Sequence, residues 1–198
     1  MTHPVEPRSP VALVTLALVF AGGSAQAQTF SVANFTNDVI HRGAGTTALE
    51  FGPTGILYLA EKRGRVLALT PNGTGGYNSP QVFADLRSAV DPRVESGLLG
   101  LAVDPEFSTQ RYIYLFYSTS SDQRLVRYTA NAAGTRGSSP TVLLSGLPQN
   151  ALFHNAGDIQ FRPGENDNIY IALGDDGAPS EAQSLTSYRG KMLRVSKS

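Results

Sequence analysis

The sequence has no cysteine and little charge. None of its 198 residues is cysteine, and 16% are charged, against about 25% in a typical soluble domain. The missing cysteine excludes a disulfide framework, thiolate metal sites and a cysteine nucleophile. Lys plus Arg and Asp plus Glu both number 16, so the formal net charge is zero. No long-range attraction to nucleic acid or to an anionic membrane is expected.

Long apolar runs are also scarce, and the one that stands out lies at the N-terminus. It spans 11 residues, Val11–Ala21, follows Arg8 and precedes Ala25-Gln-Ala27. As a helix it would cover roughly 16 Å, about half of a hydrocarbon core, which argues against a membrane anchor. The pattern predicts a secretory signal over residues 1–27 with cleavage after Ala27. Residues 28–198 would then be periplasmic or secreted, with no membrane span.

The rest of the chain repeats a pattern of short apolar runs and turns. Three segments share an apolar pair, a proline-containing turn, a core of aliphatic residues around one tyrosine, and a last run that carries Arg or Lys. The central tyrosines lie 56 residues apart: Tyr58, Tyr114 and Tyr170. A fixed period of this size indicates stacked modules of one supersecondary unit.

Each module is predicted to consist of β-strands. Runs such as Tyr112–Tyr117 are aromatic and β-branched and end at turn residues, whereas no window keeps a helical apolar rhythm over three turns. Four strands in about 50 to 60 residues are typical of one β-propeller blade. An ordinary β-sandwich is the alternative, but it gives no reason for the tyrosine period. Three segments are expected to be exposed loops: 73–76, 132–139 and 174–180.

The number of modules is low for a closed ring. About three blades fit the chain, whereas closed propellers usually have four to eight. We therefore expect either a truncated product or a chain that a partner or a second copy completes. The fold class predicted is all-β, a partial propeller of about three four-stranded blades.

Several stretches resemble a known family. Leu49–Val66 resembles the first blade of the glucose/sorbosone dehydrogenases, and Glu95–Phe107 resembles the second. His154–Phe161, Asn168–Asp175 and Gly190–Val195 are similar to the family's His-x-Gly-Gly, Gly-Asp and Gly-Lys-x-Leu-Arg segments. These proteins are soluble sugar dehydrogenases that depend on pyrroloquinoline quinone (PQQ) and form six-bladed propellers. The resemblance covers about the first half of a family domain.

The resemblance implies roles for three residues. His154 takes the place of the catalytic base beside the cofactor, where a neutral imidazole can accept a proton near pH 7. Asp175 and Glu95 take the places of substrate-binding pocket residues, and the carboxylate of Asp175 could accept hydroxyl hydrogen bonds or orient the base. Purely structural interpretations of the three residues stay open. His154 could be a structural turn residue, Asp175 a turn aspartate and Glu95 a solvated residue at the rim. Ala156 replaces a glycine that the family usually has.

The resemblance also implies PQQ and calcium as cofactors. The arginines, lysines and backbone carbonyls that hold them in the family belong to later blades, so most binding residues lie beyond this chain, and no metal ligand can be named. The expected activity is oxidation of a sugar or sugar alcohol with an external electron acceptor, weak or absent for this chain alone. The alternative is a non-catalytic propeller module that binds carbohydrate or protein.

Overall fold

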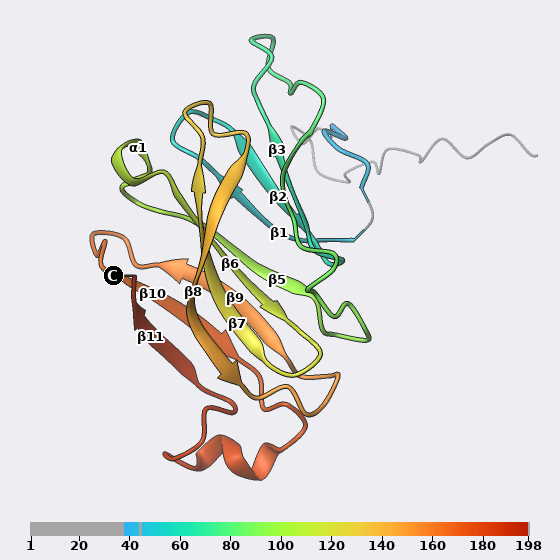
Figure 1. Ribbon diagram of the computed structural model, residues 1–198, viewed down its shortest axis with the longest axis vertical. Coiled ribbons are helices and arrows are strands. Elements are labelled where there is room, and N and C mark those ends of the chain that lie inside the picture. Colours follow the sequence, from blue (N-terminus) through green and yellow to red (C-terminus); the bar gives the residue numbers. More distant parts are fainter. Residues whose placement is uncertain (1–37, 44, 198) are drawn as a thin grey trace, which may run out of the picture. The chain divides into compact units, whose positions relative to one another are not determined.

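The computed structural model describes residues 38–43 and 45–197, and most of its regular elements are β-strands (Figure 1). The first sheet contains β1 (Thr46–Phe51), β2 (Leu57–Glu61), β3 (Arg65–Leu69) and β4 (Gln81–Asp85). The second contains β5 (Leu98–Val103), β6 (Tyr112–Ser118), β7 (Gln123–Ala130) and β8 (Gly137–Leu147). The third contains β9 (Ala156–Phe161), β10 (Asn168–Leu173) and β11 (Met192–Ser196). Two short helices, α1 (Phe107–Gln110) and η1 (Pro179–Gln183), lie in connections.

Each sheet is an antiparallel meander in which sequence neighbours pair. The predicted period is confirmed at the level of register, because Tyr58, Tyr114 and Tyr170 lie on the second strand of their sheets, at matching positions. Three successive sheets match a partial propeller and not a two-layer sandwich. The third sheet has three strands within the described residues rather than the four expected of a module.

The core lies between sheets, since strand side chains alternate between faces. On β6, Ile113, Leu115 and Tyr117 pack toward the first sheet, while Tyr114 and Phe116 pack toward the third. All five side chains are buried. The second sheet is therefore apolar on both faces, which explains why its central strand reads as a continuous apolar run without alternation.

The first strands of the sheets are neighbours. β5 contacts both β1 and β9 (Figure 1). The first strands of the three sheets therefore lie side by side, with β5 in the middle. This arrangement places the loops that precede β5 and β9 close together. The described residues from Ile40 onward form one compact unit. The predicted export signal, residues 1–27, lies outside the described residues.

Two of the three predicted exposed loops are partly wrong. The segment 174–180 contains Asp176, whose residue exposure is 4%, and the start of η1. The segment 132–139 includes the buried Thr135 and the first residues of β8. Among the described residues, no helix is long and apolar enough to cross a membrane.

Candidate functional site

The three candidate residues meet at one edge of the second and third sheets. Glu95 lies just before β5, and His154 lies just before β9. Asp175 follows the end of β10, which is antiparallel to β9, so the end of β10 lies beside the start of β9. The topology thus brings together three residues that are far apart in the sequence.

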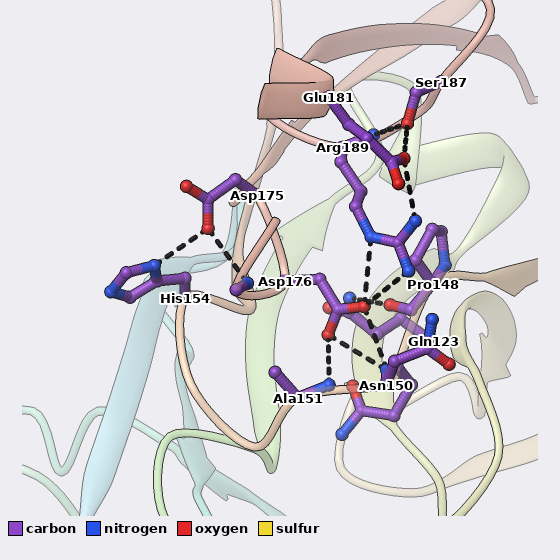
Figure 2. A network of polar contacts seen from close by, with 12 residues as sticks. Gln123, Pro148, Asn150, Ala151, His154, Asp175, Asp176, Glu181, Ser187 and Arg189 are labelled. Atoms are coloured by element: carbon purple, nitrogen blue, oxygen red, sulfur yellow. Dashed lines mark hydrogen bonds and ion pairs between the residues drawn. The ribbon is translucent and has the colours of Figure 1, made fainter. Parts of the chain in front are cut away.

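His154 and Asp175 form a direct contact. The distance from Nδ1 of His154 to Oδ1 of Asp175 is 2.8 Å (Figure 2). The same carboxylate oxygen accepts the backbone N–H of Gly177 at 3.0 Å, so Asp175 is both a turn residue and a partner of the imidazole. The hydrogen bond from His154 lowers the pKa of the Asp175 carboxyl below its usual value. With Nδ1 donating to a carboxylate, a neutral imidazole keeps Nε2 as a proton acceptor.

The imidazole is accessible. The side chain of His154 is 57% exposed, whereas that of Asp175 is 21% exposed. A small molecule can therefore reach the ring while the carboxylate behind it remains largely covered. This is the arrangement that general-base chemistry requires, because the base must contact the proton it removes.

Glu95 contacts the backbone of the histidine loop, the segment 148–155 between β8 and β9 that carries His154. Its carboxylate accepts the N–H of His154 at 2.6 Å, and its own N–H donates to the carbonyl of Leu152 at 2.9 Å. The side chain also lines an open hollow. Glu95 thus braces the loop, and its predicted contact with a substrate stays a prediction.

The backbone around His154 is tightly constrained. His154 and Ala156 have φ angles of 58° and 54°, in the left-handed region that disfavours side chains. Gly174 lies so close to the loop that a Cβ atom there would collide with the carbonyl oxygen of His154. Gly174 therefore permits the loop and β10 to pass each other, a requirement that no other residue meets.

A hollow of about 330 Å³ lies between the first strands of the three sheets. Its lining includes Thr47, Leu99, Ala156 and the carboxylates of Glu95 and Asp158, and no Lys or Arg of the described residues. PQQ has three carboxylates, which need cationic partners. The residues that line this hollow therefore do not by themselves fit this cofactor. Nor do the described residues contain a group of three or more His, Asp or Glu side chains that could hold a metal ion.

A buried polar layer under the site was missed by sequence reasoning. Its members are Ser96, Gln149, Asn155 and Asp176. Ser96, Asn155 and Asp176 directly follow a candidate residue in the sequence. This adjacency is the signal that could have identified them.

Fold and site together define a protein of the β-propeller class with a histidine–carboxylate pair where its sheets converge. The sequence model of the Glucose / Sorbosone dehydrogenase family matches residues 45–198, and the chain belongs to this family. The resemblance predicted from the sequence is thus confirmed.

Known relatives agree with this membership. Quinoprotein glucose dehydrogenase B of Acinetobacter calcoaceticus is 30% identical over 221 aligned positions, which cover 94% of this chain and 45% of the relative. A glucose dehydrogenase-type oxidoreductase of Thermus thermophilus matches with a TM-score of 0.67 and 32% identity, over 77% of this chain and 45% of that one. The PQQ-bound aldose sugar dehydrogenase of Streptomyces coelicolor matches with a TM-score of 0.65 and 25% identity, over 79% and 47%. The chain thus spans less than half the length of these relatives.

Proposed function

We propose that this chain supplies the proton-accepting part of a PQQ-dependent sugar dehydrogenase site. The substrate class is a sugar or sugar alcohol, and electrons leave to an external acceptor. The observation that carries the proposal is the 2.8 Å contact between Nδ1 of His154 and Asp175, with the imidazole open to solvent. Family membership and the PQQ-bound relative support the same reaction class.

The chemistry assigned to the protein's own residues is proton removal. Oxidising a C–OH group to a carbonyl takes a hydride from carbon and a proton from oxygen. Nε2 of His154 accepts the proton, and Asp175 stabilises the imidazolium that forms. General-base catalysis of this kind contributes typically about 10²–10⁴-fold to the rate. PQQ, when bound, supplies the hydride acceptor.

We propose that most of the groups that hold PQQ and calcium come from outside the described residues, with His154 beside the cofactor. Tyr170 and Arg194 lie on the face of the third sheet that points away from the second, at the positions that Tyr114 and Arg127 occupy one module earlier. We propose that this face packs against a further sheet, from a longer form of the protein or from a second copy. The chain alone should then have little activity.

A fusion protein provides the sharpest test of the proposed reaction. Residues 45–198 would replace the matching part of quinoprotein glucose dehydrogenase B. With PQQ, calcium and aldoses, we expect dye reduction that His154→Ala lowers by about 10²–10⁴-fold. The matched control is Asp104→Asn, which removes a buried charge at the opposite end of β5. A folded, PQQ-loaded fusion protein whose turnover is unchanged by His154→Ala would contradict the proposal.

A second candidate function is a non-catalytic carbohydrate-binding module. The absence of Lys and Arg from the described lining of the hollow favours it. So does Phe153, which is 46% exposed and lies edge-on to the His154 ring, where it could pack against a sugar. Calorimetric sugar binding that needs neither PQQ nor calcium and persists in His154→Ala would favour this function over the enzymatic one.

We also propose that the protein is exported to the periplasm or the medium. The basis is the predicted signal over residues 1–27, which lies outside the described residues. N-terminal sequencing of the exported protein should begin at Gln28. Retention of Met1 on a cell-associated protein would contradict export.

A further inference from the structure

Each candidate site residue directly precedes a buried polar residue. Glu95 and His154 are exposed, whereas the residues that follow them, Ser96 and Asn155, have 0% exposure. Asp175 is followed by Asp176, whose side chain is 1% exposed. Buried polar groups are costly unless they are hydrogen-bonded, so such a layer has to be well connected to be stable.

Asp176 is connected to both parts of the loop that carries His154 (Figure 2). Its Oδ1 accepts the backbone N–H groups of Asn150 at 3.0 Å and Ala151 at 2.8 Å. Its own backbone N–H donates to the carbonyl oxygen of His154 at 3.2 Å. One residue thus fixes the start and the end of the segment 150–154.

Arg189 completes the surroundings of this carboxylate. Its Nη2 donates to Oδ2 of Asp176 at 3.1 Å, and its Nη1 donates to Glu181 at 2.9 Å. The Arg189 side chain is 14% exposed, and its guanidinium lies between two carboxylates (Figure 2). Asp176 is therefore a charge-paired, fully engaged acceptor, the kind of buried group whose removal leaves several donors without partners.

A second network joins the loop that carries Glu95 to the loop that carries His154. Nε2 of Gln149 donates to Oγ of Ser96 at 2.7 Å, and Oγ of Ser96 donates to Oδ1 of Asn155 at 3.1 Å. Nδ2 of Asn155 donates to Oε1 of Gln149 at 3.0 Å, which closes the ring. Gln149 also directly precedes the two residues whose amides Asp176 binds.

We propose that Asp176, held by Arg189, is a positioning residue that sets the contact between His154 and Asp175. Its buried side chain is screened from any substrate, so it acts only through the loop. The part of the proposal that concerns turnover rests on the proposed function, whereas the part that concerns imidazole geometry does not.

The geometric test uses histidine NMR on the full chain. Long-range ¹H–¹⁵N spectra would be recorded for the native protein, Asp176→Ala and Arg189→Gln, with Asp104→Asn as the control. Asp104 matches Asp176 as a buried aspartate paired to one cation, since Nζ of Lys197 lies 3.0 Å from it. We expect Asp176→Ala and Arg189→Gln to lose the Nδ1–H signature of His154, and Asp104→Asn to keep it.

An unchanged Nδ1–H signature in a folded Asp176→Ala protein would overturn the proposal. If that variant does not fold, an unchanged signature in Arg189→Gln would overturn it equally. In the fusion protein, Asp176→Ala should lower kcat about 10²-fold with KM altered only a few-fold, as expected of a misplaced group. Loss of the signature in a fusion protein that is inactive even without substitution would uphold the positioning role and count against the proposed function.

Discussion

At the residue scale, the main feature is the strained backbone of the histidine loop. His154 and Ala156 both adopt left-handed φ angles, which cost a residue with a Cβ atom roughly 1–2 kcal/mol. For His154 this conformation orients the imidazole toward Asp175. For Ala156 there is no such gain, because its methyl side chain has no polar group. Ala156 therefore holds strain that a glycine would not.

Ala156→Gly should stabilise the protein. Relief of the left-handed strain outweighs the extra freedom that glycine gives the unfolded chain, for a net gain of about 0.5–1 kcal/mol. The matched control is Ala178→Gly, since φ at Ala178 is −123°, and here a loss of about 0.4–1 kcal/mol is expected. Urea unfolding measures both. A loss of stability in Ala156→Gly equal to that in the control would contradict the strain argument.

The carboxyl of Asp175 should titrate below the ordinary aspartate value. The hydrogen bond from His154 and the amide of Gly177 lower its pKa in the folded state. Its stabilising contribution is therefore complete above the unfolded value of about 3.9 and is lost as pH falls through the lower folded value. Carboxyl ¹³C titration should show the midpoint rising toward about 3.9 in His154→Ala. The same midpoint in both proteins would count against the contact.

The sequence singles out three candidate residues, whereas the contacts around them come from the structure. His154, Asp175 and Glu95 do lie together, although 21 and 59 residues separate the contacting pairs. The sequence predicts an exposed loop at Asp176, because Gly-Asp-Asp-Gly is typical of a turn. Which of the two aspartates is buried depends on Arg189 and on amides from another loop. Those contacts exist only once the third sheet has formed.

At the element scale, the central tyrosines show how one repeated position serves different interfaces. The hydroxyl of Tyr58 donates to the carbonyl of Gly134 at 2.7 Å, across to the second sheet. That of Tyr114 donates to Asp104 at 2.8 Å. Tyr170, at the same register, donates to Glu165 at 2.9 Å and is only half-buried.

One substitution made at the three tyrosines should give a graded loss of stability. Tyr114→Phe removes a donor from a buried carboxylate, at a cost of about 1.5–3 kcal/mol, and Tyr58→Phe leaves a buried carbonyl unpaired, at a cost of about 1–2 kcal/mol. Tyr170→Phe should cost under about 0.5 kcal/mol, as for a surface position. Denaturant unfolding of the three variants gives the order. A Tyr170→Phe loss as large as that of Tyr114→Phe would show that this face is already covered.

The strands were predictable because the 56-residue period and the apolar runs agree. The ordered structure of the connections was less predictable from the sequence. The segment between β10 and β11 holds η1 and Arg189, and its composition carries no sign of the ion pairs that order it. Local pattern specifies strands, whereas the order of this connection depends on long-range charge pairing.

At the scale of the whole molecule, the two outer sheet faces differ. On the face of the first sheet away from the second, Leu49, Phe51 and Val82 of the edge strands are 46–58% exposed. The side chains of the central strands on this face are buried: Leu57, Leu59, Leu67 and Leu69. On the third sheet, the outer face is more polar, with Gln160, Tyr170 and Arg194 in register. Exposed apolar side chains such as those on the edge strands of the first sheet are typical of interfaces.

Buried tyrosines should make global unfolding sensitive to alkali. Burial raises the pKa of Tyr58 to about 12 and also raises the pKa of Tyr117 and Tyr128. Unfolding returns these groups to about 10, so the unfolded state releases protons that the folded state keeps. The free energy of unfolding should therefore fall as pH rises above about 10. Tyrosinate absorbance that reaches its full value for all 8 tyrosines before circular dichroism changes would contradict this.

The central claim is that Asp175 holds His154 in the state that accepts a proton. The most direct test is the steady-state kinetics of Asp175→Asn in the fusion protein. We predict that kcat falls by roughly 10²–10⁴-fold, as for loss of the correct imidazole tautomer, while KM stays within a few-fold of the unsubstituted value. A raised KM with unchanged kcat would contradict the claim, because it would make Asp175 a binding residue.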